Sequence, residues 1–128
     1  MSGAVLGREA ILQHRPPRYE DVPVPELATD DGPAPVVRIQ ALSSTACDRF
    51  IASLWVEGPD GKIRYNRQDY AAKLLVLSAV DEKGGRVFED AHVGAIGLLD
   101  GAIVRRLAVV AERLSGLSVE QGETAKGN

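Results

Sequence analysis

The most apolar segment with regular helical spacing covers residues 70–80, YAAKLLVLSAV. Its side chains fall into two adjacent rows, which together form a wider apolar arc than a helix at the protein surface needs. Asn66 is a suitable N-cap, and Asp69 would then lie in the first turn, where a carboxylate meets the positive end of the helix dipole. We therefore predict a buried central helix over residues 67–79, ended by the DEKGG turn at 81–85. The two rows are Tyr70, Leu74, Leu77 and Ala71, Leu75, Ser78.

Three further segments have helical patterns, over residues 44–55, 90–96 and 101–115. The first follows three candidate N-caps, Ser43, Ser44 and Thr45. Its apolar residues form one face, which we expect to pack on the central helix. The last begins after Asp100, a good N-cap, and ends at Gly116, a typical C-cap residue. The residues between 57 and 66 are predicted to form a polar loop.

Residues 20–42 alternate between apolar and polar positions on either side of the turn-rich segment 28–35, which predicts a β-hairpin. Pro23 and Pro25 allow only an edge strand in its first arm. A lone hairpin is marginal in water, so its apolar side must lie on helices. The predicted fold class is α+β and mostly helical, with an N-terminal β-hairpin packed on a bundle of about four helices. We expect one globular domain at 19–118, a flexible arm at 1–18 and a flexible tail at 119–128.

Composition and charge exclude several classes of protein. The chain has 128 residues, a formal net charge of -3 and a single cysteine, which fits one cytoplasmic domain without disulfides. Its acidic balance argues against a general nucleic-acid binder, which usually displays a basic face. The start of the chain lacks the pattern of a secretory signal. The apolar run at 93–104 is too short to span a bilayer and contains Asp100, so we expect no membrane partner.

Candidates for catalysis or metal binding are weak. His14, His92 and Cys47 are the only imidazole and thiol groups, and their spacing fits no common zinc site. Cys47 lies on the inner helical face, where a small core residue is the better interpretation than a nucleophile. The DEKGG turn places Lys83 at the third ligand position of a calcium loop, which excludes that site. We expect no enzyme activity, no cofactor, no metal and no small-molecule substrate.

One group of basic and aromatic residues precedes the central helix and is the candidate binding site. An acidic partner or a nucleic acid could contact it. The alternative is a solvated loop with Tyr65 or Tyr70 tucked into the core. Trp55 is either a core residue or a partly exposed interface anchor, because a large aromatic side chain suits both places. The candidate partner-binding residues are Trp55, Lys62, Arg64, Tyr65 and Arg67.

Several motifs follow one another along the chain in an order that resembles a known family. They are DRFIASL at 48–54, LLVLSAVDEKG at 74–84, FEDAHVGAIG at 88–97 and RLSGLS at 113–118. In this order and spacing they are similar to the small tail assembly chaperones of long-tailed bacteriophages. The resemblance covers most of the chain from Arg8 onward. Two departures concern the hairpin region: the loop at 28–35 is longer and richer in proline, and Ala46 stands where a capping glutamate is usual.

The resemblance implies a non-enzymatic role in the bacterial cytoplasm during virus assembly. Members of that family bind the tape measure protein, promote assembly of the tail tube protein around it and leave before the virion is finished. The implied partners are therefore these two proteins, and self-association stays an open alternative. The main alternative function is a small helix-turn-helix-like DNA-binding regulator built from residues 90–97 and 100–114. Its basic residues would be Arg105, Arg106 and Arg113.

Overall fold

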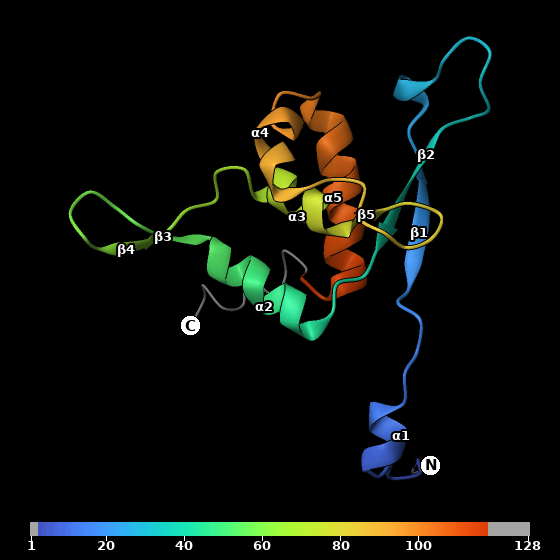
Figure 1. Ribbon diagram of the computed structural model, residues 1–128, viewed down its shortest axis with the longest axis vertical. Helices are drawn as coiled ribbons and strands as arrows, with labels where there is room; N and C mark the ends of the chain where they lie inside the picture. Colours follow the sequence, from blue (N-terminus) through green and yellow to red (C-terminus); the bar gives the residue numbers. More distant parts are fainter. Residues whose placement is uncertain (1–2, 118–128) are drawn as a thin grey trace.

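The computed structural model describes residues 3–117 and has a mixed α+β fold (Figure 1). Two short 3-10 helices, η1 and η2, accompany the α-helices and strands. In chain order the elements are α1 (Arg8–Leu12), β1 (Tyr19–Pro23), η1 (Pro25–Leu27), β2 (Val36–Gln40), α2 (Ser44–Ser53), β3 (Trp55–Glu57), β4 (Ile63–Tyr65), α3 (Tyr70–Ser78), β5 (Ala79–Val80), η2 (Asp90–His92), α4 (Val93–Ile96) and α5 (Gly101–Ser115).

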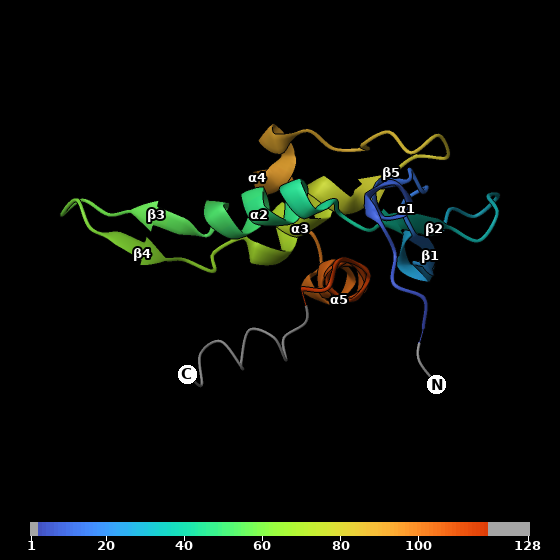
Figure 2. The ribbon, with the colours of Figure 1, turned by 90° about the horizontal axis from the view of Figure 1, so that it is seen from below.

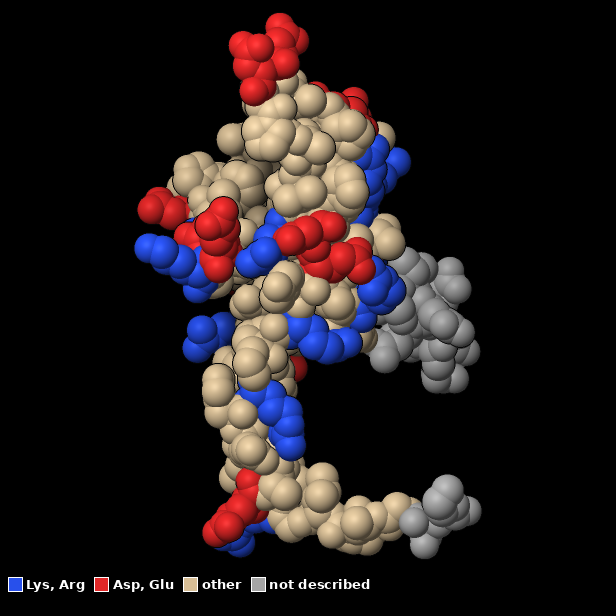
Figure 3. All heavy atoms as spheres, turned by 90° about the vertical axis from the view of Figure 1, so that its right-hand side faces the viewer, with Lys and Arg blue, Asp and Glu red and all other residues tan. Residues whose placement is uncertain are grey.

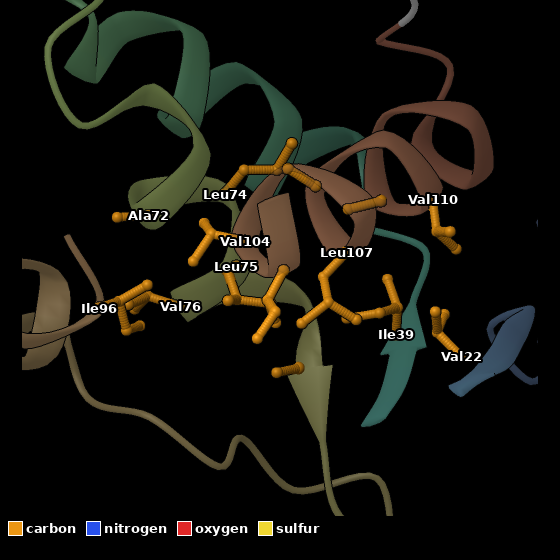
Figure 4. Packing of buried hydrophobic residues seen from close by; sticks show 14 of the residues in the cluster. Val22, Ile39, Ala72, Leu74, Leu75, Val76, Ile96, Val104, Leu107 and Val110 are labelled. Carbon is orange, nitrogen blue, oxygen red and sulfur yellow. The ribbon is translucent and has the colours of Figure 1, made fainter. Parts of the chain in front are cut away.

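Helix α3 is the buried centre of the molecule, as its wide apolar arc predicts. Leu74, Leu75 and Val76 are each at most 2% exposed. Helix α5 packs against α3 and supplies Val104 and Leu107 to the same cluster (Figure 4). Consecutive residues point to different sides of a helix, so α3 is buried on several sides and has little surface left for a polar face.

The N-terminal hairpin belongs to a three-stranded antiparallel sheet in the order β1-β2-β5. Strand β1 is at the edge, as the prolines around it predict, with Pro23 opposite Val36. The apolar side of the sheet faces the helices: Val24 and Ile39 are fully buried, and Val22 is 5% exposed. The hairpin therefore packs on helices, as expected.

Helix α5 confirms the prediction for residues 101–115 at both ends. The Asp100 carboxylate accepts a hydrogen bond from the Ala102 N–H at 2.8 Å. Gly116 ends the helix with φ of 73°, a left-handed conformation that glycine adopts without steric cost. Leu117 then donates its N–H to the Glu112 carbonyl at 2.8 Å and packs against the core.

The prediction for the start of the central helix was wrong by three residues. Asn66 does not cap α3; its side chain accepts from the Gln68 N–H at 2.8 Å and closes a local turn. Asp69 occupies the N-cap position with φ of 62°, a left-handed conformation that interrupts the helix there. The other end also differs, because Ala79 pairs with Ile39 of β2 and continues as strand β5 instead of helix.

The predicted loop at 57–66 and the predicted helix end at 55 were both wrong. Helix α2 ends at Ser53, and Trp55 begins a second antiparallel hairpin, β3–β4. The apolar and aromatic residues of this hairpin favour strands. Gly61 adopts φ of 77° in the connecting turn, where a residue without Cβ is needed. The predicted helix at 90–96 consists of the 3-10 turn η2 followed by four residues of α4.

The N-terminal segment stands away from the body of the molecule (Figure 1). Helix α1 has five residues and none of them is buried. The segment connecting it to β1 contains Pro16 and Pro17 and no regular structure. The predicted tail at 119–128 lies outside the described residues.

Candidate partner-binding surface

The β3–β4 hairpin projects from one side of the molecule, beyond the end of α2 (Figures 1 and 2). All six of its strand residues are exposed. At its base, Leu54 is 3% exposed, and its carbonyl accepts a hydrogen bond from the Asn66 N–H at 2.6 Å. We call residues 55–65 the projecting hairpin.

One face of the projecting hairpin carries three aromatic or apolar residues and one carboxylate, that of Glu57. Trp55 lies opposite Tyr65, and Glu57 lies opposite Ile63. Because side chains alternate along a strand and opposite residues share a face, Trp55, Tyr65 and Ile63 point to the same side. Their exposed fractions are 52%, 39% and 70%. The rings of Trp55 and Tyr65 are 5.2 Å apart between centroids and tilted by 60°.

The structure places the five predicted residues on this hairpin and just after it. Trp55 and Tyr65 are partners across the strands, and Arg64 is opposite Val56 on the other face. The guanidinium of Arg67 donates to the Tyr65 hydroxyl at 3.4 Å and stacks 4.3 Å from the centre of the Tyr70 ring. Lys62 lies in the connecting turn, where its N–H donates to Asp60 at 3.1 Å. The structure brings the group together; its role in binding stays a prediction.

The charge of the projecting hairpin is balanced. Arg64 donates to both carboxylate oxygens of Asp60, at 2.6 and 3.1 Å. These hydrogen bonds from Arg64 lower the pKa of the Asp60 carboxyl, followed by one from the Lys62 backbone. Glu57 and Asp60 thus offset Lys62 and Arg64. The hairpin has an apolar face with balanced charges around it, which suits a protein partner better than a phosphate backbone.

Sequence reasoning missed Ile63, the most exposed apolar residue of this face. It was assigned to a polar loop because Gly58, Pro59, Asp60 and Gly61 dominate that stretch. The signal that could have found it is the alternation of Ile63 and Tyr65 after the turn, mirrored by Trp55 and Glu57 before it. A turn flanked by two such runs is typical of a hairpin.

A groove of about 450 Å³ adjoins the projecting hairpin. Arg67 links the two features, because it contacts Tyr65 and also lines the groove. At the side of the groove, the Tyr70 hydroxyl donates to Glu112 Oε2 at 3.0 Å. Burial, and then this bond to Glu112, raise the pKa of Tyr70, so the phenol stays neutral. The pair is a satisfied structural contact between α3 and α5.

The described residues offer little for catalysis. Residues 3–117 contain no group of three or more His, Cys, Asp or Glu side chains arranged to hold a metal ion. Cys47 is half-buried, and burial, with the nearby Asp48 charge, raises the pKa of its thiol. A raised pKa reduces the thiolate fraction, which is the reactive form. Within the same residues, no helix combines the length and hydropathy that crossing a bilayer requires.

The contacts of α5 disfavour the helix-turn-helix interpretation. Arg106 binds Glu26 with two hydrogen bonds, and Arg113 binds Glu20 at 2.8 Å. Two of the three basic residues of the expected recognition helix are therefore engaged by the N-terminal hairpin. Helix α4 has only four residues, too few for the first helix of such a motif.

Comparison with known proteins gives one structural likeness. No protein-family model and no curated protein sequence matches the chain. The solved structure of the bacteriophage HK97 tail assembly chaperone is similar, with a TM-score of 0.55. The likeness covers 82% of this chain and 88% of that chain, at 18% sequence identity. The protein therefore has a fold like that of a phage tail assembly chaperone.

Proposed function

We propose that this protein is a non-enzymatic chaperone of phage tail assembly that acts in the cytoplasm of the bacterial host. In this proposal it binds the tape measure protein, promotes assembly of the tail tube and is absent from the finished virion. The observation that carries the proposal is the fold likeness to a tail assembly chaperone over most of both chains. The order of the sequence motifs at 48–54, 74–84, 88–97 and 113–118 supports it independently of that fold.

The projecting hairpin supplies a surface suited to such a role. A long helical protein that awaits its tube exposes apolar side chains and needs temporary cover. Trp55, Ile63 and Tyr65 offer an apolar face, and rigid aromatic residues are the usual anchors of protein interfaces. The net charge of -3 keeps the chaperone itself away from neutrality, which favours its solubility.

The proposal is tested first by the neighbouring genes. A tail tube gene before this one and a very long helical gene after it would support the proposal, and a metabolic operon would contradict it. The second test is co-expression with a helical segment of that long gene product. We expect the soluble fraction of the segment to rise when the chaperone is present, and to stay unchanged if the proposal is wrong.

Matched substitutions locate the binding surface. Trp55→Ser should reduce the soluble fraction of the segment, because it removes the largest anchor of the projecting hairpin. Val36→Ser is the control: Val36 is 53% exposed, against 52% for Trp55, but lies on β2. Equal effects of the two substitutions would remove the hairpin from the proposal. Salt-dependent binding of the purified protein to duplex DNA would instead favour a regulator.

A further inference from the structure

The N-terminal segment exposes apolar side chains that the rest of the described chain leaves uncovered. Val5, Leu6, Ile11 and Leu12 are between 57% and 99% exposed. They lie on or beside α1, which has no buried residue. Figure 3 shows this segment standing clear of the body, with uncharged surface toward its tip. We call residues 3–14 the N-terminal arm, and residues 15–18, which join it to β1, its root. Exposed apolar side chains gathered on one short element indicate a surface that is covered in an assembly.

The groove between α3 and α5 could accept the apolar side chains of the N-terminal arm. Its floor includes small residues, Ala71, Ala72 and Ala108, which allow another backbone to approach closely. Leu99 and Val109 line its rim and are 53% and 58% exposed. The groove has a volume of about 450 Å³.

Charges at the two surfaces are also complementary. The arm carries Arg8 and Glu9, and neither makes an ion pair with another described residue. Arg105 and Asp69 line the groove and are likewise without an ion-pair partner among residues 3–117. An arm in the groove could therefore pair Glu9 with Arg105 and Arg8 with Asp69.

The root of the arm directs it away from the groove of its own chain. The guanidinium of Arg18 donates to the Leu114 carbonyl at 2.6 Å, which fixes the root beside the C-terminal end of α5. From there the arm runs away from α4 and from the first turns of α5 (Figure 1), whereas the groove extends along α5 from Gly101 as far as Glu112. Pro16 and Pro17 restrict the connecting segment, since each proline fixes its own φ and limits the residue before it.

We propose that two copies of this chain exchange N-terminal arms, each arm occupying the groove between α3 and α5 of the other copy. Such an exchange is reciprocal and therefore closes as a symmetric dimer. It covers the arm's apolar residues and the groove's rim in a single step. The inference concerns self-association and does not rest on the proposed chaperone function.

The mass of the protein in solution tests the dimer. Light scattering after size-exclusion chromatography should give twice the chain mass of 13.7 kDa. Leu12→Asp in the arm and Val109→Asp in the groove should each return the mass to that of one chain. Leu27→Asp is the control, because Leu27 is 54% exposed but lies in η1, and it should remain dimeric. A monomeric wild-type protein would overturn the proposal, as would dimers that survive both substitutions.

Cross-linking tests which segments meet. Two variants are prepared in a Cys47→Ser background, one with Leu12→Cys and one with Val109→Cys, and their folding is checked by circular dichroism. Mild oxidation of the mixture should give a disulfide-linked heterodimer, in higher yield than either variant alone. A chain carrying both cysteines should also link between chains. A link formed only within one chain would show an arm folded onto its own groove and would overturn the exchange.

The result can be separated from the chaperone test. Trp55→Ser changes the projecting hairpin and leaves arm and groove intact, so it should stay dimeric while losing the helical segment. Leu12→Asp should become monomeric whether or not a tape measure segment binds. Loss of the dimer by Trp55→Ser would contradict the assignment of self-association to the arm and groove.

Discussion

The N-terminal hairpin β1–β2 and the projecting hairpin β3–β4 have a similar local construction but different surroundings. Both are antiparallel pairs of strands with apolar residues at alternating positions. Helix α5 and the central helix lie behind the first, so Val22 and Ile39 are buried. The second has no core behind it, and every strand residue is exposed.

The difference shows that local pattern specifies the strands, whereas tertiary packing decides what the apolar side chains do. A two-stranded hairpin is at best marginally stable in water. The N-terminal hairpin gains its stability from burial against the helices and from pairing with β5. The projecting hairpin has its turn, its strand pairing and the Trp55–Tyr65 contact, and its apolar side chains stay exposed.

The largest expected effect comes from removing the core on which the first hairpin rests. Leu74 is fully buried, and Leu74→Asp would place a carboxylate among apolar side chains without a partner. The cost of burying a charge is comparable to the whole stability of a domain, about 5–15 kcal/mol. We expect the variant to lose its helical circular dichroism and its cooperative thermal transition. Leu98→Asp, at a position 89% exposed, should behave as the wild type. A folded Leu74→Asp variant would contradict this description of the core.

Two isoleucines compare the hairpins directly. Ile39 of β2 is fully buried, and Ile63 of β4 is 70% exposed. Ile39→Ala should lower the free energy of unfolding by about 2–5 kcal/mol, because it removes buried methyl groups and leaves a cavity. Ile63→Ala should change it by no more than about 0.5 kcal/mol, as surface substitutions usually do. Urea denaturation of both variants gives the two values. Similar losses would mean that the projecting hairpin is part of the core.

The sequence predicts those parts of the fold in which local signals and burial agree. Helix α5 has an N-cap at Asp100, a C-cap at Gly116 and a regular apolar stripe, so its bounds could be predicted to the residue. The buried central helix and the edge position of β1 also follow from pattern and proline placement.

The remaining elements depend on contacts that a local pattern does not contain. Ala79 is apolar and could extend α3, but its pairing with Ile39 across the sheet makes it a strand residue. Trp55 completes the apolar stripe of α2 in sequence, yet it pairs with Tyr65 in the projecting hairpin. For the candidate site, the sequence predicts which basic and aromatic residues belong to it and that they lie just before the central helix. The face shared by Trp55, Tyr65 and Ile63 could not, because it depends on strand register.

A smaller effect should distinguish the hairpins by local opening. Amide hydrogen exchange of β1 and β2 should approach the global stability, whereas β3 and β4 should exchange through local opening at much lower free energy. Trp55→Ala removes a cross-strand aromatic pair, which is worth about 0.2–1 kcal/mol. It should therefore speed exchange severalfold in β3 and β4 only. Equal protection of both hairpins, measured by NMR, would contradict the difference drawn between them.

The smallest expected effect concerns the ion pair that ties the N-terminal hairpin to α5. Two hydrogen bonds from Arg106, and then one from the backbone of Glu26 itself, lower the pKa of the Glu26 carboxyl from 4.5 to about 2. Because the folded-state pKa is depressed, the pair stabilises the protein above pH 4.5, and this contribution is lost as the pH falls from 4.5 through about 2.

Glu26→Gln should therefore flatten the dependence of the unfolding midpoint on pH in that window, since no charge remains to titrate. Glu9→Gln is the matched control: Glu9 lies in the N-terminal arm and makes no ion pair within residues 3–117, so the wild-type slope should persist. Both carboxylates are at the surface, so the expected difference is small and is best measured at low ionic strength, where exposed charges are screened least. Identical pH profiles for Glu26→Gln and the wild type would show that this ion pair adds no measurable stability, and that burial and the Arg113–Glu20 contact hold the N-terminal hairpin on α5.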